Sequence, residues 1–196
     1  MGREKFHEIW TEWDKIKDEL CRTRAIYVYG TMGYGKSHIL AALACLLIRN
    51  GERVIYLPDC GKMLSAPLHY FKLAFRLAFR APKYASDLKK ILECNSIEDL
   101  IEICQWWIDL TFIIDQKSAL DAHPDATDNV SAAKWGLRQQ LAQLGYSHIT
   151  ITSVSANQPS AEDSKRTIRR LRCLAACRMC GLSSSTMHNA YLSDLD

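Results

Sequence analysis

Residues 30–37 read Gly30-Thr31-Met32-Gly33-Tyr34-Gly35-Lys36-Ser37, and this stretch decides which fold the chain is expected to adopt. It follows the apolar run 25–29 and leads into the apolar run 39–48, so it connects a predicted strand to a predicted helix. Its glycines let successive backbone N–H groups face inward, and the helix that follows directs its positive dipole end to the same place. The pattern therefore predicts a phosphate-binding loop of the Walker A type, the alternative being a glycine-rich turn that binds nothing.

Two side chains of this loop have expected chemical roles. Lys36 is expected to reach the β- and γ-phosphates of a nucleoside triphosphate, and the hydroxyl of Ser37 to help coordinate Mg²⁺. The candidate nucleotide-binding residues are Gly30, Thr31, Met32, Gly33, Tyr34, Gly35, Lys36, Ser37 and His38.

Length and composition are those of an ordinary globular protein. The 196 residues suit one domain with an extension, and 48% hydrophobic with 24% charged residues lies near the average. The formal charge of +3 is too small to indicate a nucleic-acid partner. The N-terminus lacks an apolar signal core, Phe6 stands where myristoylation requires Ser or Thr, and the longest apolar run has only ten residues. We expect a soluble intracellular protein, cytoplasmic or nuclear, without a membrane partner.

The eight cysteines mostly lack metal-ligand spacing, so reduced thiols are expected. The exception is a group of three, Cys173, Cys177 and Cys180, whose C-x3-C-x2-C spacing suits an iron–sulfur cluster. Together with His188 these cysteines would offer four zinc ligands. The alternative is that thiols simply fall on neighbouring turns of a basic helix.

The second chemical landmark is the apolar run 110–114, which ends at Asp115. Such a run suits a strand buried on both faces. Ligands of open α/β sheets bind outside the carboxyl ends of the strands, so Asp115 is expected beside the phosphate loop, sharing the Mg²⁺ shell with Ser37. The alternative is an acid that merely ends a strand.

Two more predicted strands, 53–57 and 148–154, complete the expected sheet. Asn157 follows the last of them and is expected either to orient a water or contact the γ-phosphate, or simply to begin a turn before Pro159.

The order of elements predicts a three-layer α/β P-loop NTPase of the additional-strand class, with a mostly parallel sheet between helices. The Asp115 strand is expected one strand away from the phosphate-loop strand, with the last strand between them. A fifth strand is not recognisable, so the first strand lies at an edge or is covered.

The remaining segments are expected to be helical or loosely ordered. Residues 6–20 have the spacing of an amphipathic helix, residues 61–106 read as short helices, and residues 132–144 as a further helix. We expect three parts: an N-terminal helix over 1–24, the NTPase core over 25–158, and a basic helical or poorly ordered extension over 159–196.

Two basic clusters each allow two interpretations. The first follows a helical spacing opposite phenylalanines and comprises His69, Lys72, Arg76, Arg80 and Lys83. It is either a solvated face or a docking site for an acidic partner or nucleic-acid phosphates. The second lies in the C-terminal extension and comprises Lys165, Arg166, Arg169, Arg170, Arg172 and Arg178. It is either a surface helix or a segment that binds nucleic acid or supplies an arginine to a neighbouring nucleotide.

The chain resembles the NTPase module of Crinkler-type effectors and retrotransposon hot spot proteins over about residues 5–158. The resemblance rests on FHEIW from residue 6, GTMGYGKSHILA from residue 30, RVIYLPDC from residue 53, FIIDQKSALD from residue 112 and ITSVSAN from residue 151. It implies an ATP-binding module of mobile-element or effector proteins, often joined to a nuclease-like or other toxic domain. No such attached domain is recognisable in these residues.

Gln116 departs from the pattern of ordinary ATPases of this class, which place a glutamate directly after the aspartate of the strand. A glutamine orients water but cannot accept its proton, so hydrolysis is expected to be slow. Asp121 offers a carboxylate six residues after Asp115, but sequence alone does not place it.

Three functions compete on this evidence. The first is a slow Mg²⁺-dependent ATPase, with Lys36, Asp115, Gln116 and Asn157 as candidate catalytic residues, that drives a conformational switch or the assembly of a homo-oligomer or an attached effector domain. The second is a nucleotide-binding interaction module with negligible hydrolysis. The third is a small-molecule kinase, which shares the loop spacing but for which no arginine-rich lid is recognisable.

Overall fold

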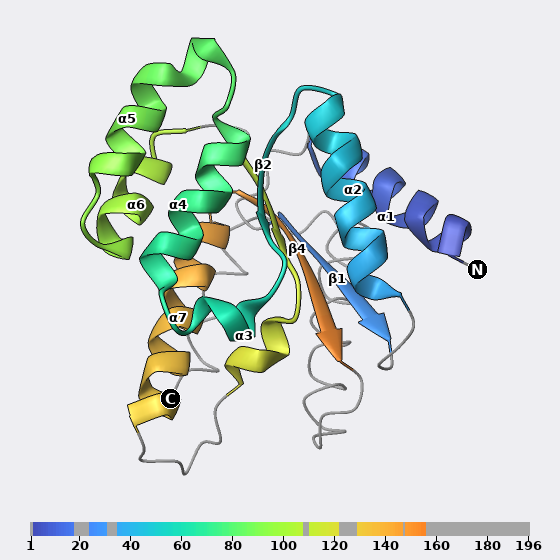
Figure 1. Cartoon of the computed structure of the whole chain (residues 1–196). Coiled ribbons are helices and arrows are strands. Elements are labelled where there is room, and N and C mark those ends of the chain that lie inside the picture. Colours follow the sequence, from blue (N-terminus) through green and yellow to red (C-terminus); the bar gives the residue numbers. More distant parts are fainter. Residues whose placement is uncertain are drawn as a thin grey trace, which may run out of the picture. The chain divides into compact units, whose positions relative to one another are not determined.

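Four strands form one parallel sheet in the computed structural model, which describes residues 2–17, 24–30, 35–107, 110–121, 129–146 and 148–155 (Figure 1). All described residues belong to one unit, residues 1–156. The strands are β1 (Arg24–Gly30), β2 (Arg53–Leu57), β3 (Leu110–Ile114) and β4 (Ile149–Ser155). They lie in the order β1-β4-β3-β2, and each neighbouring pair is parallel. The predicted strand order is confirmed, because β4 lies between the strand before the predicted loop and the strand before Asp115.

Two helices, α1 (Gly2–Lys17) and α2 (Lys36–Arg49), cover one face of the sheet (Figure 1). Val54, Ile113 and Ile151 point to this side and pack against buried residues of both helices. Trp13 of α1 is only 2% exposed, and its indole Nε1 donates a hydrogen bond to Thr111 Oγ1 at 3.2 Å. The amphipathic N-terminal helix predicted from the sequence is confirmed as far as Lys17; residues 18–20 lie outside the described part.

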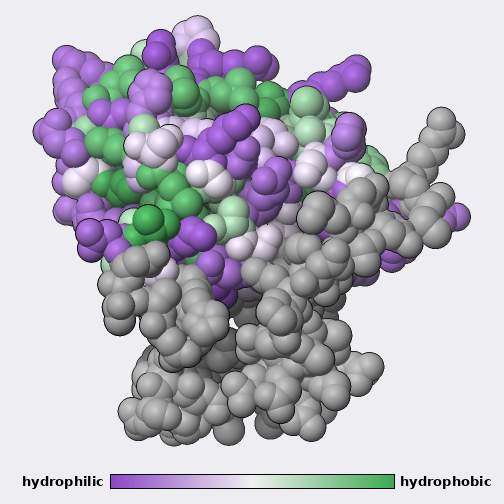
Figure 2. All heavy atoms as spheres, turned by 60° about the horizontal axis from the view of Figure 1, so that its bottom comes forward, coloured by the Kyte–Doolittle hydropathy of each residue, from purple (hydrophilic) through white to green (hydrophobic). Residues whose placement is uncertain are grey.

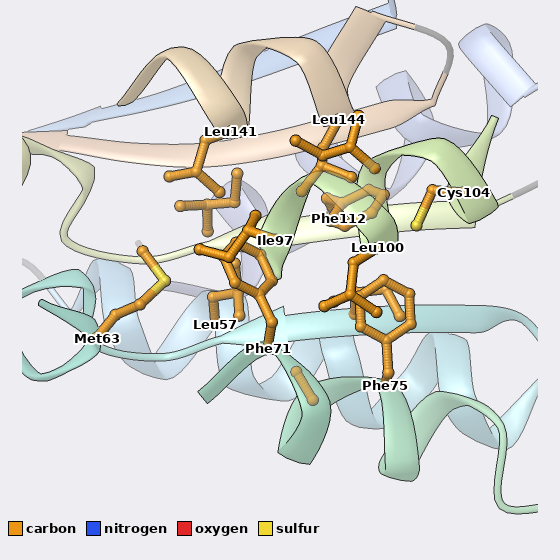
Figure 3. Close-up of a cluster of buried hydrophobic side chains, with 14 of the residues drawn as sticks. Leu57, Met63, Phe71, Phe75, Ile97, Leu100, Cys104, Phe112, Leu141 and Leu144 are labelled. Atoms are coloured by element: carbon orange, nitrogen blue, oxygen red, sulfur yellow. The ribbon is translucent and has the colours of Figure 1, made fainter. Parts of the chain in front are cut away.

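The opposite face carries the larger core (Figure 3). Its elements are α3 (Cys60–Met63), α4 (Pro67–Ala78), η1 (Pro82–Tyr84), α5 (Ala85–Glu93), α6 (Ile97–Cys104), η2 (Lys117–Leu120) and α7 (Asn129–Tyr146). Leu57 and Phe112 of the sheet pack here against Phe71 and Phe75 of α4, all fully buried. Burying each such side chain contributes roughly 1.5–3 kcal/mol. The described residues therefore form the three-layer α/β arrangement, with helices on both faces of the sheet.

Local sequence explains where the helices of this layer begin and end. Pro67 occupies the first turn of α4, where its missing N–H costs no hydrogen bond. Ser96 and Asp99 form a capping box at the start of α6. Ala81 precedes Pro82 and is extended, with φ −71° and ψ 140°, which ends the helical run before η1.

This last feature corrects one expectation from the sequence. The basic residues at 69–83 were expected to form one stripe on a helix, but α4 ends at Ala78, so Arg80 and Lys83 lie beyond it. Lys72 Nζ donates a hydrogen bond to Leu92 O at 2.8 Å, so the ammonium group of Lys72 is directed to this carbonyl and does not extend the predicted basic stripe. The helix predicted over 132–144 is longer than expected, as α7 spans Asn129–Tyr146.

The described residues bear on the expected membrane spans, metal sites and cysteines. Within the described residues no helix is long and apolar enough to span a membrane, and no group of three or more metal-ligating side chains occurs. Cys45, Cys60, Cys94 and Cys104 are free thiols, as predicted. The basic extension and the group Cys173, Cys177 and Cys180 lie outside the described residues.

Candidate nucleotide-binding site

The described ends of the predicted phosphate loop are Gly30, the last residue of β1, and Gly35, which directly precedes α2 (Figure 1). Gly35 precedes α2 with φ 74° and ψ 17°, a left-handed conformation that favours glycine, and its carbonyl accepts the first helical hydrogen bond from Ile39 N at 3.0 Å. Residues 31–34 lie outside the described residues, so Thr31, Met32, Gly33 and Tyr34 keep their predicted role without a structural account. Of the rest, Lys36 is half-buried, and Ser37 and His38 are exposed at the first turn of α2.

Asp115 lies at the carboxyl end of β3 and is buried, with 2% exposure. Its backbone N–H donates to Leu57 O at 2.8 Å, which continues the pairing of β3 with β2 by one residue. A buried carboxylate needs hydrogen bonds or a cation to offset the loss of water. Asp115 has hydrogen bonds: Gln116 N–H donates to its Oδ1 at 2.9 Å, and Ser153 Oγ donates to the same oxygen.

Ser153 joins this site from β4 and was not singled out from the sequence. Ile114 of β3 pairs with Thr152 of β4, so the next residues along, Asp115 and Ser153, lie side by side. Gln116 N–H also donates to Ser153 Oγ at 2.9 Å, which closes a three-residue network. The only signal in the sequence was the presence of polar residues inside a buried strand.

The geometry of this network leaves one carboxylate oxygen for a ligand. Both hydrogen bonds donated to Asp115 by the described residues end on Oδ1, so the lone pairs of Oδ2 suit a hard cation or a water bound to it. The hydroxyl of Ser37 at the start of α2 is a second oxygen donor at the same end of the sheet. Asp115 and Ser37 both offer oxygen atoms, the ligand type that Mg²⁺ prefers, and Mg²⁺ keeps several waters as further ligands.

Gln116 turns the chain directly after Asp115. Its φ of 55° and ψ of 36° lie in the left-handed region, and its side chain is exposed. The backbone N–H of Gln116 thus donates hydrogen bonds within the network around Asp115, while the side chain of Gln116 is exposed to solvent. This arrangement allows the amide to hold a water molecule near a ligand at the sheet edge.

A second layer of ionisable groups surrounds Asp115. Burial raises the pKa of the Cys60 thiol to about 12 and also raises the pKa of Tyr56. The negative charge of the Asp115 carboxylate adds to both increases. Burial also lowers the pKa of Lys117, with repulsion from Arg138 as the second cause. The sequence did not single out these residues, because only the packing of α3 against η2 brings Cys60 near Lys117.

Two other predicted residues are not joined to the site by the structure. Asp121 forms an ion pair with Arg138 of α7, so its carboxylate already has a partner away from Gln116. Asn157 lies outside the described residues, and its predicted role is neither supported nor contradicted.

Figure 2 shows the molecule with the bottom of the Figure 1 view turned forward. Hydrophilic and hydrophobic residues alternate in small areas over its described part. The chain matches no protein-family model and has no significant similarity to a curated protein.

Proposed function

We propose that this chain is a P-loop module that binds a nucleoside triphosphate with Mg²⁺ and hydrolyses ATP slowly. The observation that carries the proposal is the position of a buried, hydrogen-bonded Asp115 at the same sheet edge as the Gly35-Lys36-Ser37 start of α2. One strand separates β1 from β3, which is a spacing of about 10 Å between their backbones. A Mg²⁺–triphosphate group of that scale bridges a loop on one strand and a carboxylate on the other.

Each residue has a distinct task in this proposal. The loop amides and Lys36 hold the β- and γ-phosphates, Ser37 and Asp115 hold the cation shell, and Ser153 fixes the orientation of the Asp115 carboxylate. Bound Mg²⁺ supplies charge neutralisation on the phosphates. Gln116 orients the attacking water by hydrogen bonding but accepts no proton, so hydrolysis is slow.

The resemblance to Crinkler-type and retrotransposon hot spot modules supports a switch role. In such a role the bound triphosphate and the hydrolysed product favour different conformations of an attached effector domain or an assembly of copies. The second candidate is a nucleotide-binding interaction module with negligible turnover. It is favoured by the same Gln116, which leaves the site without a carboxylate directly after Asp115.

A nucleotide titration with and without Mg²⁺, followed by phosphate release on the same sample, tests the proposal. Lys36→Ala removes the phosphate-binding ammonium and is expected to weaken ATP binding by about a hundredfold or more. The matched control is Lys90→Ala, which removes one exposed ammonium from α5 and is expected to leave binding unchanged. Folded protein that binds no nucleoside triphosphate with Mg²⁺ present would overturn both candidates, and tight binding without phosphate release would select the second.

A further inference from the structure

A cavity of about 210 Å³ lies at the opposite end of the sheet from the nucleotide site, where α2 ends and β2 begins. In Figure 1 the C-terminal ends of α2 and α4 meet this end of the sheet. We propose that the cavity and the adjoining face of α4 form a docking site for an acidic segment of a partner protein that carries a leucine-sized side chain. This proposal does not depend on nucleotide binding.

The charge of the cavity selects an acidic partner. Arg53, Arg80 and Lys83 line it, and Glu52 is the single acid among the lining residues. Glu52 already pairs with Lys17 Nζ at 2.5 Å, so its charge is largely offset. Arg80 and Lys83 are exposed, and their side chains are able to reach carboxylates at the rim.

The walls of the cavity select an apolar anchor. Ile48 of α2 and Leu77, Ala78 and Ala81 at the end of α4 line it together with the cations. Leu77 is 42% exposed, and Leu73, one helical turn earlier, is 49% exposed. Residues four apart share one face of a helix, so these two leucines extend the apolar wall along α4.

The aromatic contacts disfavour a nucleic acid as the occupant. A single-stranded nucleic acid binds through bases stacked on exposed aromatic faces. The Tyr84 ring is already occupied: the Arg53 guanidinium lies 5.6 Å and Lys83 Nζ 4.8 Å from its centroid, and the Phe79 ring packs at 5.5 Å. Apolar walls with a basic rim instead match a peptide in which leucine is flanked by aspartate and glutamate.

The test measures binding of a short fluorescent peptide in which leucines alternate with pairs of aspartate and glutamate, by anisotropy on the full chain. Two further probes are a peptide with the leucines replaced by serine and an oligothymidylate of similar length and charge. The variants are Arg80→Glu with Lys83→Glu, which reverses the rim, and Leu77→Ser, which changes the wall. The matched control is Lys89→Glu with Lys90→Glu, which reverses two exposed charges on α5 outside the lining.

We expect saturable binding of the leucine peptide, weakened about tenfold or more by the rim variant and several-fold by Leu77→Ser, with the control pair changing the affinity by less than about twofold. Circular dichroism and urea midpoints establish that each variant is folded. Absence of saturable binding, equal binding of the serine peptide, equal loss in the control pair, or stronger binding of the oligothymidylate would each overturn the proposal.

Discussion

At the scale of single residues, Gln116 has an unusual backbone conformation. Among the described residues other than glycine it alone has a positive φ, 55°. A left-handed conformation costs a non-glycine residue about 1–2 kcal/mol. The two hydrogen bonds that its N–H donates, to Asp115 Oδ1 and Ser153 Oγ, offset this cost. The strained position therefore belongs to the same network that orients the candidate metal-binding carboxylate.

Gln116→Glu is expected to accelerate phosphate release by roughly tenfold or more, because a carboxylate is able to accept the proton of the attacking water. The measurement is single-turnover hydrolysis of ATP with Mg²⁺. Gln116→Ala is the control and should be no faster than the parent chain. A glutamate variant that binds ATP normally but hydrolyses it no faster would contradict the assigned role of Gln116.

At the scale of elements, α2 is bounded by two glycines that both have left-handed backbones. Gly35 precedes the helix with φ 74°, and Gly51 follows it with φ 85°. An added Cβ at either position meets no atom within 4 Å, so the backbone conformation alone makes alanine unfavourable. Gly35 lies at the candidate phosphate site, whereas Gly51 lines the cavity at the other end of the sheet. Alanine substitutions at Gly35 and Gly51 are therefore a matched comparison, with a similar backbone penalty but only one of them at the candidate phosphate site.

Alanine at either glycine is expected to lower the free energy of unfolding by about 1–2 kcal/mol, measured by urea denaturation. Only Gly35→Ala should also weaken ATP binding, by about tenfold or more, because it disturbs the start of α2. Equal nucleotide affinity of the two variants would contradict the placement of the phosphate site at Gly35.

At the scale of the whole molecule, buried cysteine thiols and half-buried tyrosine hydroxyls on several elements respond to pH in the same direction. The pKa values of Cys60, Cys94, Cys104, Tyr56 and Tyr70 are all raised, mainly by burial. Each group stays protonated in the folded chain at a pH at which it ionises in the unfolded chain. The unfolded state therefore binds fewer protons at alkaline pH, and stability falls as pH rises.

For Cys60 this loss begins near the unfolded value of 9.0 and continues until the pH reaches about 12. We expect Cys60 alone to lower the free energy of unfolding by about 1 kcal/mol at about pH 10 relative to about pH 8. Urea denaturation at both pH values measures the change. Cys60→Ala is less stable at both because of the cavity it leaves, but its stability should fall less between them. An identical fall in parent and variant would contradict a buried, protonated thiol.

The sequence by itself determined the elements and the chemical landmarks on them. The strand over 53–57, the strand that ends before Asp115, the end of α2 before Gly51 and the new helix at Pro67 all follow from local signals: hydrophobic period, glycine and proline. Parallel strands that are connected through helices allow only a few strand orders, so the position of β4 between β1 and β3 could also be predicted from the sequence.

Only the tertiary structure decided which polar groups meet. Ser153 contacts Asp115 across 38 residues because β3 and β4 pair in one particular register, and Cys60 lies near Lys117 because α3 packs on η2. The cavity at the amino end of β2 likewise needs Arg53, Leu77 and Lys83 to converge from separate elements. Hydrophobic pattern and turn chemistry depend on neighbours along the chain, whereas register and convergence depend on how completed elements pack, which no local stretch of sequence specifies.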